Sequence, residues 1–301
     1  MASRPMRPEW SRLREAMSAS PPESVRLVAT ADEVVSLVER GDCAVGILPV
    51  ASIDDVRAAY LQGVDLGSAA AVAGLRRLAW ALIGQDLTGG PIFGAVVEAL
   101  AGLGDRESRL FAARLWMDLG DDAHAARALA LARTASDADD DGAAHLLLGY
   151  MANRGYGLPA DDVESARLHA VAAARGNADA QFELAVFAHT GRIAPPDQEA
   201  AVRWCRAAAA RAHPRALYSL GAFYATGDGV PQDETEALAC YLRAAEAGHG
   251  KAAATAAVMY WRGEGAAVDR QRARGLFHRA EEQGFDPEPL LEEAGISLDD
   301  R

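Results

Sequence analysis

Cysteine is scarce in this chain of 301 residues, and its placement argues against two common kinds of site. Cys43, Cys205 and Cys240 are odd in number, and none belongs to a CxxC pair. A disulfide framework uses an even set of cysteines and a structural zinc site uses closely paired ligands, so we expect neither. Residues 1–10 also lack the apolar core of a secretory signal. These features predict a cytoplasmic protein.

Long apolar runs are missing as well. The two longest, 69–75 and 78–83, are separated by Arg76 and Arg77. A transmembrane helix needs about 20 consecutive apolar residues, so neither run is long enough to cross a bilayer. Because 50% of the residues are nonetheless hydrophobic, the chain can bury a substantial core. We expect a soluble protein without membrane insertion.

Positive charge is limited to 30 basic residues against 43 acidic ones, which gives a net charge of −13. Only one of the basic residues, Lys251, is a lysine. Binding to nucleic acid requires a basic surface that neutralises phosphates, so the composition excludes a general nucleic-acid binder. The preference for arginine, together with abundant alanine, indicates a bacterial genome rich in GC.

Motifs for catalysis, cofactors and metals are also missing from the sequence. It contains no HExxH, no GxSxG and no phosphate-binding loop. The acidic run 137–142 could be imagined as a metal loop, but it lacks the terminal glutamate of a calcium site, so we interpret it as a solvated connection. We therefore expect no cofactor, no metal and no enzymatic activity, with the question left open for residues 1–105.

What the sequence does contain is a repeat with a period of 36 residues. Four copies follow one another without gaps between about Ala144 and Phe285. A fixed period of this length is typical of stacked repeat architectures. Three positions show the register: Ala144, Ala180, Ala216 and Ala252; Asp161, Asp197, Asp233 and Asp269; and Ala172, Ala208, Ala244 and Ala280.

Each repeat is predicted to form two antiparallel helices, A and B. Helix A places small and apolar residues at helical spacing, and Gly227 and Gly229 of the third repeat suit the turn that follows it. The second repeat has Ile193 where the other three have the second glycine, so we expect its loop to differ in shape. Alanine at the recurring contact positions allows the helices to approach closely.

The repeated aspartates are predicted to cap the B helices. Asp233 is followed three residues later by Glu236, and Asp161 by Glu164, and both pairs are interpreted as capping boxes. An array of catalytic carboxylates is the competing interpretation. One aspartate per repeat at a helix start favours capping.

The histidines are interpreted mainly as structural. His213 and His249 share one repeat position at the end of helix B, and His169 occupies a position that faces the core. Only His189 falls on the predicted binding face described below, where recognition is a better explanation than catalysis.

This pattern resembles the Sel1-like repeat family, which is related to tetratricopeptide repeats. Residues 220–249 fit the family pattern most closely. The resemblance implies an all-α fold, a right-handed α/α superhelical solenoid. It also implies a scaffold or adaptor for protein complexes.

Four regions are expected along the chain. Residues 1–105 form an irregular helical region, in which 25–50 could alternatively be strand–helix–strand. Residues 106–142 form a tetratricopeptide-like helix pair, with Trp116 in its first helix, and the acidic connection. Residues 143–285 form the four repeats, and residues 286–301 form a capping helix with a tail.

The predicted binding surface is a concave groove lined by the A helices. Each repeat places an aromatic residue on this face, and three of the four add a cation, a combination that suits recognition of acidic or C-terminal carboxylate groups on a peptide. The alternative is that Phe182 and Tyr218 simply pack between neighbouring A helices. The candidate groove residues are Tyr150, Arg154, Phe182, His189, Arg215, Tyr218, Lys251, Trp261 and Arg262.

We therefore predict a scaffold that binds a protein or peptide in this groove. The alternative is a regulator or enzyme whose active part is the N-terminal third, with the repeats as a targeting arm. A structural oligomer that stacks through its terminal repeats is a third class.

Overall fold

The computed structural model describes residues 79, 91–102, 105–120, 122–137 and 141–296. Within these residues, the regular secondary structure is entirely helical, as the sequence predicts. Most of the expected irregular helical region 1–105, including the ambiguous segment 25–50, lies outside the described residues. The alternative of an active N-terminal third falls mostly on that same part of the chain.

The chain divides into two compact units. The first contains α5 (Pro91–Gly102), α6 (Arg106–Leu119), the short 3₁₀ helix η1 (Asp122–His124) and α7 (Ala125–Ser136). Here α6 and α7 pack together as a helix pair, and the ring of Trp116 in α6 stacks on His124 with 4.7 Å between ring centroids. Helix α6 ends at Gly120 in the left-handed conformation.

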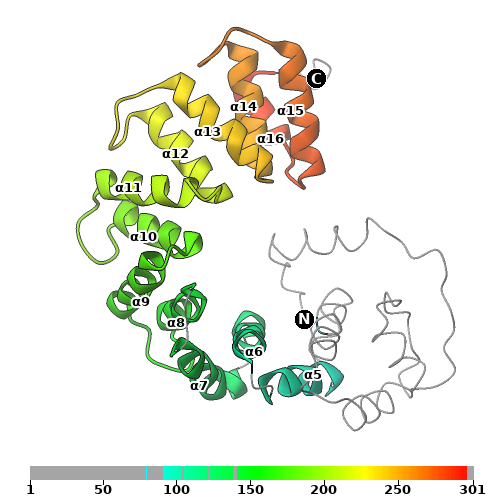
Figure 1. Cartoon of the computed structure of the whole chain (residues 1–301). Coiled ribbons are helices and arrows are strands. Elements are labelled where there is room, and N and C mark those ends of the chain that lie inside the picture. Colours follow the sequence, from blue (N-terminus) through cyan, green and yellow to red (C-terminus); the bar gives the residue numbers. More distant parts are fainter. Residues whose placement is uncertain (1–78, 80–90, 103–104, 121, 138–140, 297–301) are drawn as a thin grey trace, which may run out of the picture. The chain divides into compact units, whose positions relative to one another are not determined.

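The second unit contains the four repeats, whose helices follow one another from green to red in Figure 1. Each helix packs against the one before it and the one after it, which is the contact pattern of an α/α solenoid. The helix pairs are α8 (Ala143–Arg154) with α9 (Asp162–Ala174), α10 (Ala178–Thr190) with α11 (Gln198–Ala209), α12 (Pro214–Thr226) with α13 (Glu234–Glu246), and α14 (Gly250–Arg262) with α15 (Arg270–Glu282).

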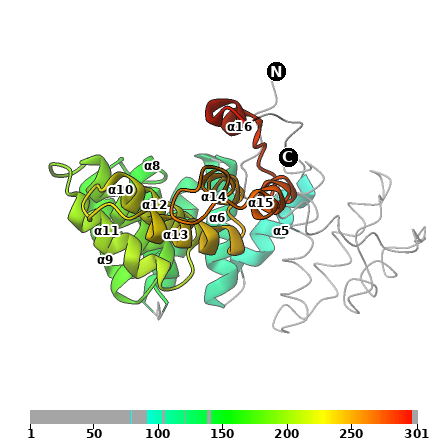
Figure 2. The ribbon, with the colours of Figure 1, turned by 90° about the horizontal axis from the view of Figure 1, so that it is seen from above.

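A last helix, α16 (Glu288–Ala294), follows the fourth repeat and contacts α14 (red in Figure 2). It buries Leu291 completely and so covers the apolar end of the repeat stack. It lies in the segment after Phe285 where the sequence predicts a capping helix. Within the part of the chain that is described, no helix is both long enough and apolar enough to span a bilayer.

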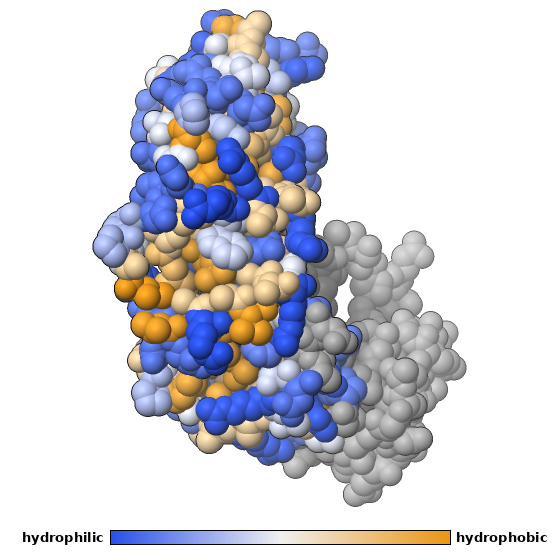
Figure 3. All heavy atoms as spheres, turned by 60° about the vertical axis from the view of Figure 1, so that its left-hand side comes forward, coloured by the Kyte–Doolittle hydropathy of each residue, from blue (hydrophilic) through white to orange (hydrophobic). Residues whose placement is uncertain are grey.

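Alanine forms the contact between the helices of the repeats. One shared alanine in each helix A and one in each helix B is completely buried. These are Ala144, Ala180, Ala216 and Ala252 of the A helices, and Ala172, Ala208, Ala244 and Ala280 of the B helices. A methyl side chain is small enough to let two helix backbones approach, and it loses no side-chain entropy on burial. On the face shown in Figure 3, by contrast, polar side chains predominate and the apolar areas are small and separate.

Glycine in helix A makes room for an aromatic ring that comes from helix B of the same repeat. A Cβ atom at Gly221 would lie 2.8 Å from Cδ1 of Tyr241, and one at Gly149 would lie 2.5 Å from Cε1 of His169. Glycine is required at both positions because a real Cβ atom would collide with the ring.

The repeated aspartates cap the B helices as predicted, but the capping boxes are wrong. Asp161 accepts hydrogen bonds from the backbone N–H groups of Val163 and Glu164. The N–H of Asp161, which a capping-box glutamate would engage, instead donates to the carbonyl oxygen of Ala152, and Glu164 is paired with Arg167.

The same backbone bond recurs in all four repeats, from the aspartate N–H to a carbonyl near the end of helix A. It joins Asp161 to Ala152, Asp197 to Ala188, Asp233 to Tyr224 and Asp269 to Tyr260, at 2.9 to 3.0 Å. This bond closes the A–B loop and leaves no donor for a capping box.

The second A–B loop differs from the others, as expected. Gly191 still ends helix A in the left-handed region, like its counterparts in the other repeats. Gly229 and Gly265 have positive φ, but Ile193 at the equivalent position does not. Its side chain is left 40% exposed.

Ala212 carries backbone strain that its counterparts avoid. Its φ is 57°, whereas Gly176, Gly248 and Gly284 occupy this left-handed position in the other repeats. The left-handed region costs an L-residue about 1–2 kcal/mol, and glycine's extra freedom in the unfolded chain offsets part of the relief. We predict that Ala212→Gly raises the free energy of unfolding by about 0.5–1 kcal/mol, measured by urea denaturation.

The matched variant is Gly248→Ala, because a Cβ atom there would meet nothing within 4 Å and only backbone strain changes. It should destabilise the protein by about 1 kcal/mol. If Ala212→Gly lowered the free energy of unfolding as Gly248→Ala does, this result would contradict backbone strain at Ala212.

His169 makes stability depend on pH, because it is 1% exposed and its Nδ1 atom has no hydrogen-bond partner. Burial lowers the pKa of His169 from 6.5 to about 4. Between these values the unfolded chain binds a proton that the folded chain does not. The free energy of unfolding should therefore fall as the pH falls from about 6.5 to about 4, by about 3 kcal/mol in total.

His169→Phe should remove this contribution, since an aromatic ring is retained and nothing titrates. In urea denaturation, the free energy of unfolding of the variant relative to that of the parent protein should be higher at pH 5 than at pH 7.5. An equal gain at both pH values would show that His169 does not titrate differently in the folded and unfolded states.

Candidate functional site: the A-helix groove

The predicted groove residues lie along one face of the four A helices, which we call the A-helix groove. They differ in exposure: Phe182 is 6% exposed, Tyr150, Tyr218 and Trp261 are half-buried, and the remaining five are exposed.

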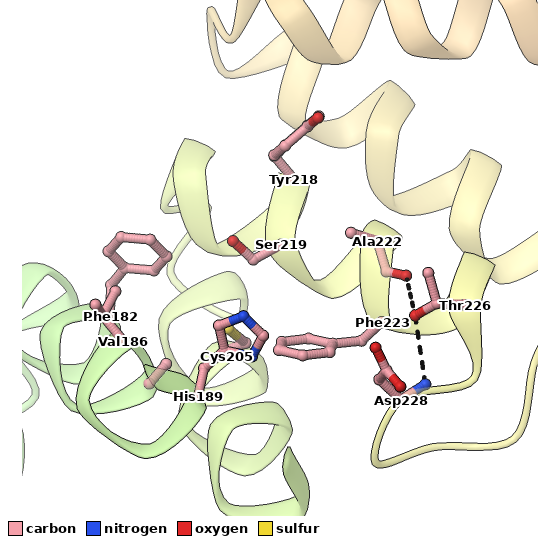
Figure 4. A pocket seen from close by; sticks show the side chains of 11 residues that line it. Phe182, Val186, His189, Cys205, Tyr218, Ser219, Ala222, Phe223, Thr226 and Asp228 are labelled. Carbon is pink, nitrogen blue, oxygen red and sulfur yellow. Dashed lines mark hydrogen bonds between the residues drawn. The ribbon is translucent and has the colours of Figure 1, made fainter. Parts of the chain in front are cut away.

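A pocket of about 220 Å³ lies between α10 and α12 in the middle of this groove (Figure 4). Its walls are mainly apolar, and its polar groups come from both helices and from the loop after α12. The lining residues are Phe182, Ala185, Val186, His189, Cys205, Tyr218, Ser219, Ala222, Phe223, Thr226 and Asp228.

The pocket brings together three of the candidate residues, Phe182, His189 and Tyr218. Val186, Ala222 and Thr226, which lie at helical spacing from these residues, also line it. The pocket thus contains three of the nine candidate groove residues.

Phe182 is held between the last residue of its own repeat, His213, and a cation of the next repeat, Arg215. The ring of His213 stacks on it with 4.9 Å between centroids, and the guanidinium of Arg215 lies 4.6 Å from its ring centroid. This arrangement combines aromatic stacking with a cation–π contact. The ring joins two repeats and also forms one wall of the pocket.

Tyr218 repeats the same arrangement one repeat later. His249 stacks on its ring at 4.7 Å, and the Lys251 ammonium lies 5.6 Å from the ring centroid. Inter-repeat packing, considered above as the alternative to binding, is thus a real role of both aromatic residues. Their other edges still line the pocket, so packing and binding are compatible.

His213 and His249 have a role that register alone did not identify. The backbone N–H of His213 closes the preceding helix B, as expected, by donating to the carbonyl of Ala208. Its side chain, however, caps the following helix A, because Nδ1 accepts the N–H of Ala216 at 3.1 Å. The ring proton is therefore on Nε2, which donates to Asp179 at 3.1 Å. His249 caps α14 through Ala252 in the same way.

The other candidate residues lie outside the pocket. The hydroxyl of Tyr150 donates to Oε1 of Glu183 at 3.2 Å, and burial raises the pKa of that carboxyl although the hydrogen bond opposes the shift. Arg270 lies 5.0 Å from the centroid of Trp261, and Arg262 pairs with Glu264 at 3.8 Å. Arg154 is exposed in the last turn of α8.

The chemistry of the pocket favours binding over catalysis. Cys205 at its inner wall is 1% exposed, and burial raises the pKa of its thiol to about 12, so the nucleophilic thiolate is absent at neutral pH. In the described part of the chain, no group of three histidine, cysteine or acidic residues is placed to bind a metal.

Sequence reasoning missed Asp228, Ser219 and Phe223 as pocket residues. Ser219 follows Tyr218 and Phe223 follows Ala222 on α12, so a wider helical face would have included them. Asp228 lies in the A–B loop between Gly227 and Gly229. Nothing in the period indicated that this loop folds back over the pocket.

Comparison with known families agrees with this geometry. The family model of the Sel1 repeat matches residues 142–177, 178–213, 214–249 and 251–285. The protein contains four Sel1 repeats. Sel1 repeat proteins generally mediate protein–protein interactions, and the family is typically a scaffold without enzymatic activity.

Solved structures support the same fold. A Sel1 repeat protein from Oxalobacter formigenes is 22% identical, with a TM-score of 0.53 over 75% of this chain and 82% of its own. The protein c5321, described as a protective antigen present in uropathogenic Escherichia coli strains, is 19% identical with a TM-score of 0.54. That match covers 85% of this chain and 57% of c5321. A comparison with curated proteins finds no significant match.

The two functions of His213 can be separated by mutation, because Asn177 caps helix A at the same position of the second Sel1 repeat. His213→Asn should keep the cap and lose the stacking on Phe182, whereas His213→Ala loses both. We expect the alanine variant to be less stable than the asparagine variant by about 1 kcal/mol in urea denaturation.

The control is His278→Ala, since His278 is exposed on α15 and should contribute little. Equal stabilities of His213→Asn and His213→Ala would show that the side chain does not act as a cap.

Proposed function

We propose that the A-helix groove binds a peptide segment of a partner protein, so that the chain acts as an interaction scaffold or adaptor. The observation that supports this most directly is the pocket between α10 and α12, which opens on the face whose spacing predicted binding. A concave apolar site with a few polar groups is the usual form of a recognition site.

The size of the pocket favours a peptide side chain over a small-molecule ligand. Sites for drug-sized ligands measure about 300–1,000 Å³, and this pocket holds about 220 Å³. One large apolar side chain fills such a space. Interfaces commonly depend on one or a few anchors of this kind.

The cations of the groove support the further expectation that the partner carries acidic or C-terminal carboxylate groups. Arg215 and Lys251 are both exposed and follow the capping histidines at the start of α12 and α14. Their contacts with Phe182 and Tyr218 hold them at the same end of the groove. An arginine held in this way can bind a carboxylate through two parallel hydrogen bonds.

The test begins with affinity capture from the native cell, identification of the partner by mass spectrometry, and measurement of its Kd. Tyr218→Ala, Trp261→Ala and Arg215→Glu remove predicted contacts. Ala222→Trp fills the pocket without removing an inter-repeat contact. We expect Ala222→Trp to weaken binding by about tenfold or more, which corresponds to about 1.4 kcal/mol.

Ala239→Trp, at an exposed alanine of α13, is the matched control and should leave the Kd unchanged. Circular dichroism melting of each variant separates lost folding from lost binding. An unchanged Kd in all four groove variants would overturn the proposal.

A further inference from the structure

One end of the pocket carries the negative charge of Asp228. Asp228 is exposed, and its backbone N–H donates to Oγ1 of Thr226 at 3.4 Å (Figure 4). Within the described residues, no basic side chain forms an ion pair with its carboxylate. This leaves the carboxylate of Asp228 available at the rim of an apolar pocket.

The same loop position is paired in the neighbouring repeats. Glu264, 36 residues later, pairs with Arg262 at 3.8 Å. Arg192, 36 residues earlier, pairs with Asp162 at 2.6 Å. Asp228, in the loop that borders the pocket, is thus the only one of these three charged residues without an ion-pair partner within the described residues.

Two other polar groups that line the pocket can accept hydrogen bonds. Oε1 of Gln198 accepts a hydrogen bond from Nδ1 of His189 at 2.7 Å, so in the tautomer that carries its single ring proton on Nδ1 the Nε2 atom is an acceptor. The hydroxyl of Thr226 donates to the carbonyl of Ala222 at 3.0 Å, so its proton is also used. A group that brings several hydrogen-bond donors and a positive charge complements this set.

We propose that the pocket and Asp228 together recognise a partner segment in which a large apolar side chain is followed closely by an arginine. The apolar side chain occupies the space between α10 and α12, and the guanidinium binds the carboxylate of Asp228. This inference rests on the proposed function and adds the chemistry of the partner at one end of the groove.

Arginine fits this end better than lysine does. Its planar guanidinium can donate two parallel hydrogen bonds to the carboxylate, and it is less strongly hydrated than an ammonium group. The net charge of −13 also attracts a basic segment from a distance.

The length of the site sets the spacing of the two residues. Ala222 and Thr226, the last residue of α12, are four residues apart, which corresponds to about 6 Å along the helix, and Asp228 follows in the loop. In an extended segment, alternate side chains point the same way and are about 6.6 Å apart. With the reach of an arginine side chain, a spacing of two residues spans the distance.

The probe is a series of eight-residue peptides with blocked ends and a flexible Gly/Ser background. Each peptide contains phenylalanine and, two residues later, arginine, glutamine or glutamate. Binding to the ¹⁵N-labelled full chain is followed by chemical-shift titration up to about 5 mM, which detects even Kd values near 1 mM. We expect the arginine peptide to bind about tenfold more tightly than the glutamine peptide at low salt.

Charge reversal provides the decisive comparison. Asp228→Asn should abolish the preference for arginine, and Asp228→Lys should shift the preference to the glutamate peptide. Glu264→Gln, which removes a negative charge at the same position of the next repeat, should change nothing. Ala222→Trp should prevent binding of all three peptides.

Two results would overturn the inference. One is that no peptide of the series binds; the other is a preference for the glutamate peptide that Arg215→Glu, but not Asp228→Asn, removes. In either case the proposed function is judged separately, by whether Ala222→Trp weakens binding of the captured partner.

Discussion

The close contact between alanine-lined helix faces is the constraint on which the repeat structure depends. Completely buried alanines recur at fixed positions of both helices, and larger residues there would push neighbouring backbones apart. Glycine takes over where a ring must fit, as Gly221 does for Tyr241. The capping aspartate and its backbone bond to the end of helix A then complete each repeat.

Between repeats, stability and the candidate site share the same side chains. The histidine that caps helix A also stacks on an aromatic residue of the preceding helix A, and a cation two residues later covers that ring. Phe182 with His213 and Tyr218 with His249 are two copies of this contact. Phe182 and Tyr218 also line the pocket. A Tyr218 variant can therefore lose binding because it loses stability, so both quantities are measured for it.

The site has the character of a recognition surface. Its thiol is buried and protonated, its histidine has a hydrogen-bond partner in the next helix, and its walls are apolar. Sel1 repeats generally bind proteins, and this chain presents a pocket of side-chain size on the face of the A helices. The opposite charges near the two ends of α12, Arg215 and Asp228, give the groove a direction that a bound segment must match.

Local features were determined by the sequence itself. The period of 36, the aspartate caps, the glycine-ended A helices and the stripe containing Phe182 and Tyr218 follow from helical spacing and backbone preference, which act over a few residues. Contacts across repeats were decided only by the tertiary structure. The capping box at Asp161 fails because Ala152 takes its N–H, His213 caps a helix that begins after it, and Asp228 reaches the pocket through a folded loop. Each of these depends on which groups compete for one donor or one space, and a linear pattern does not contain that competition.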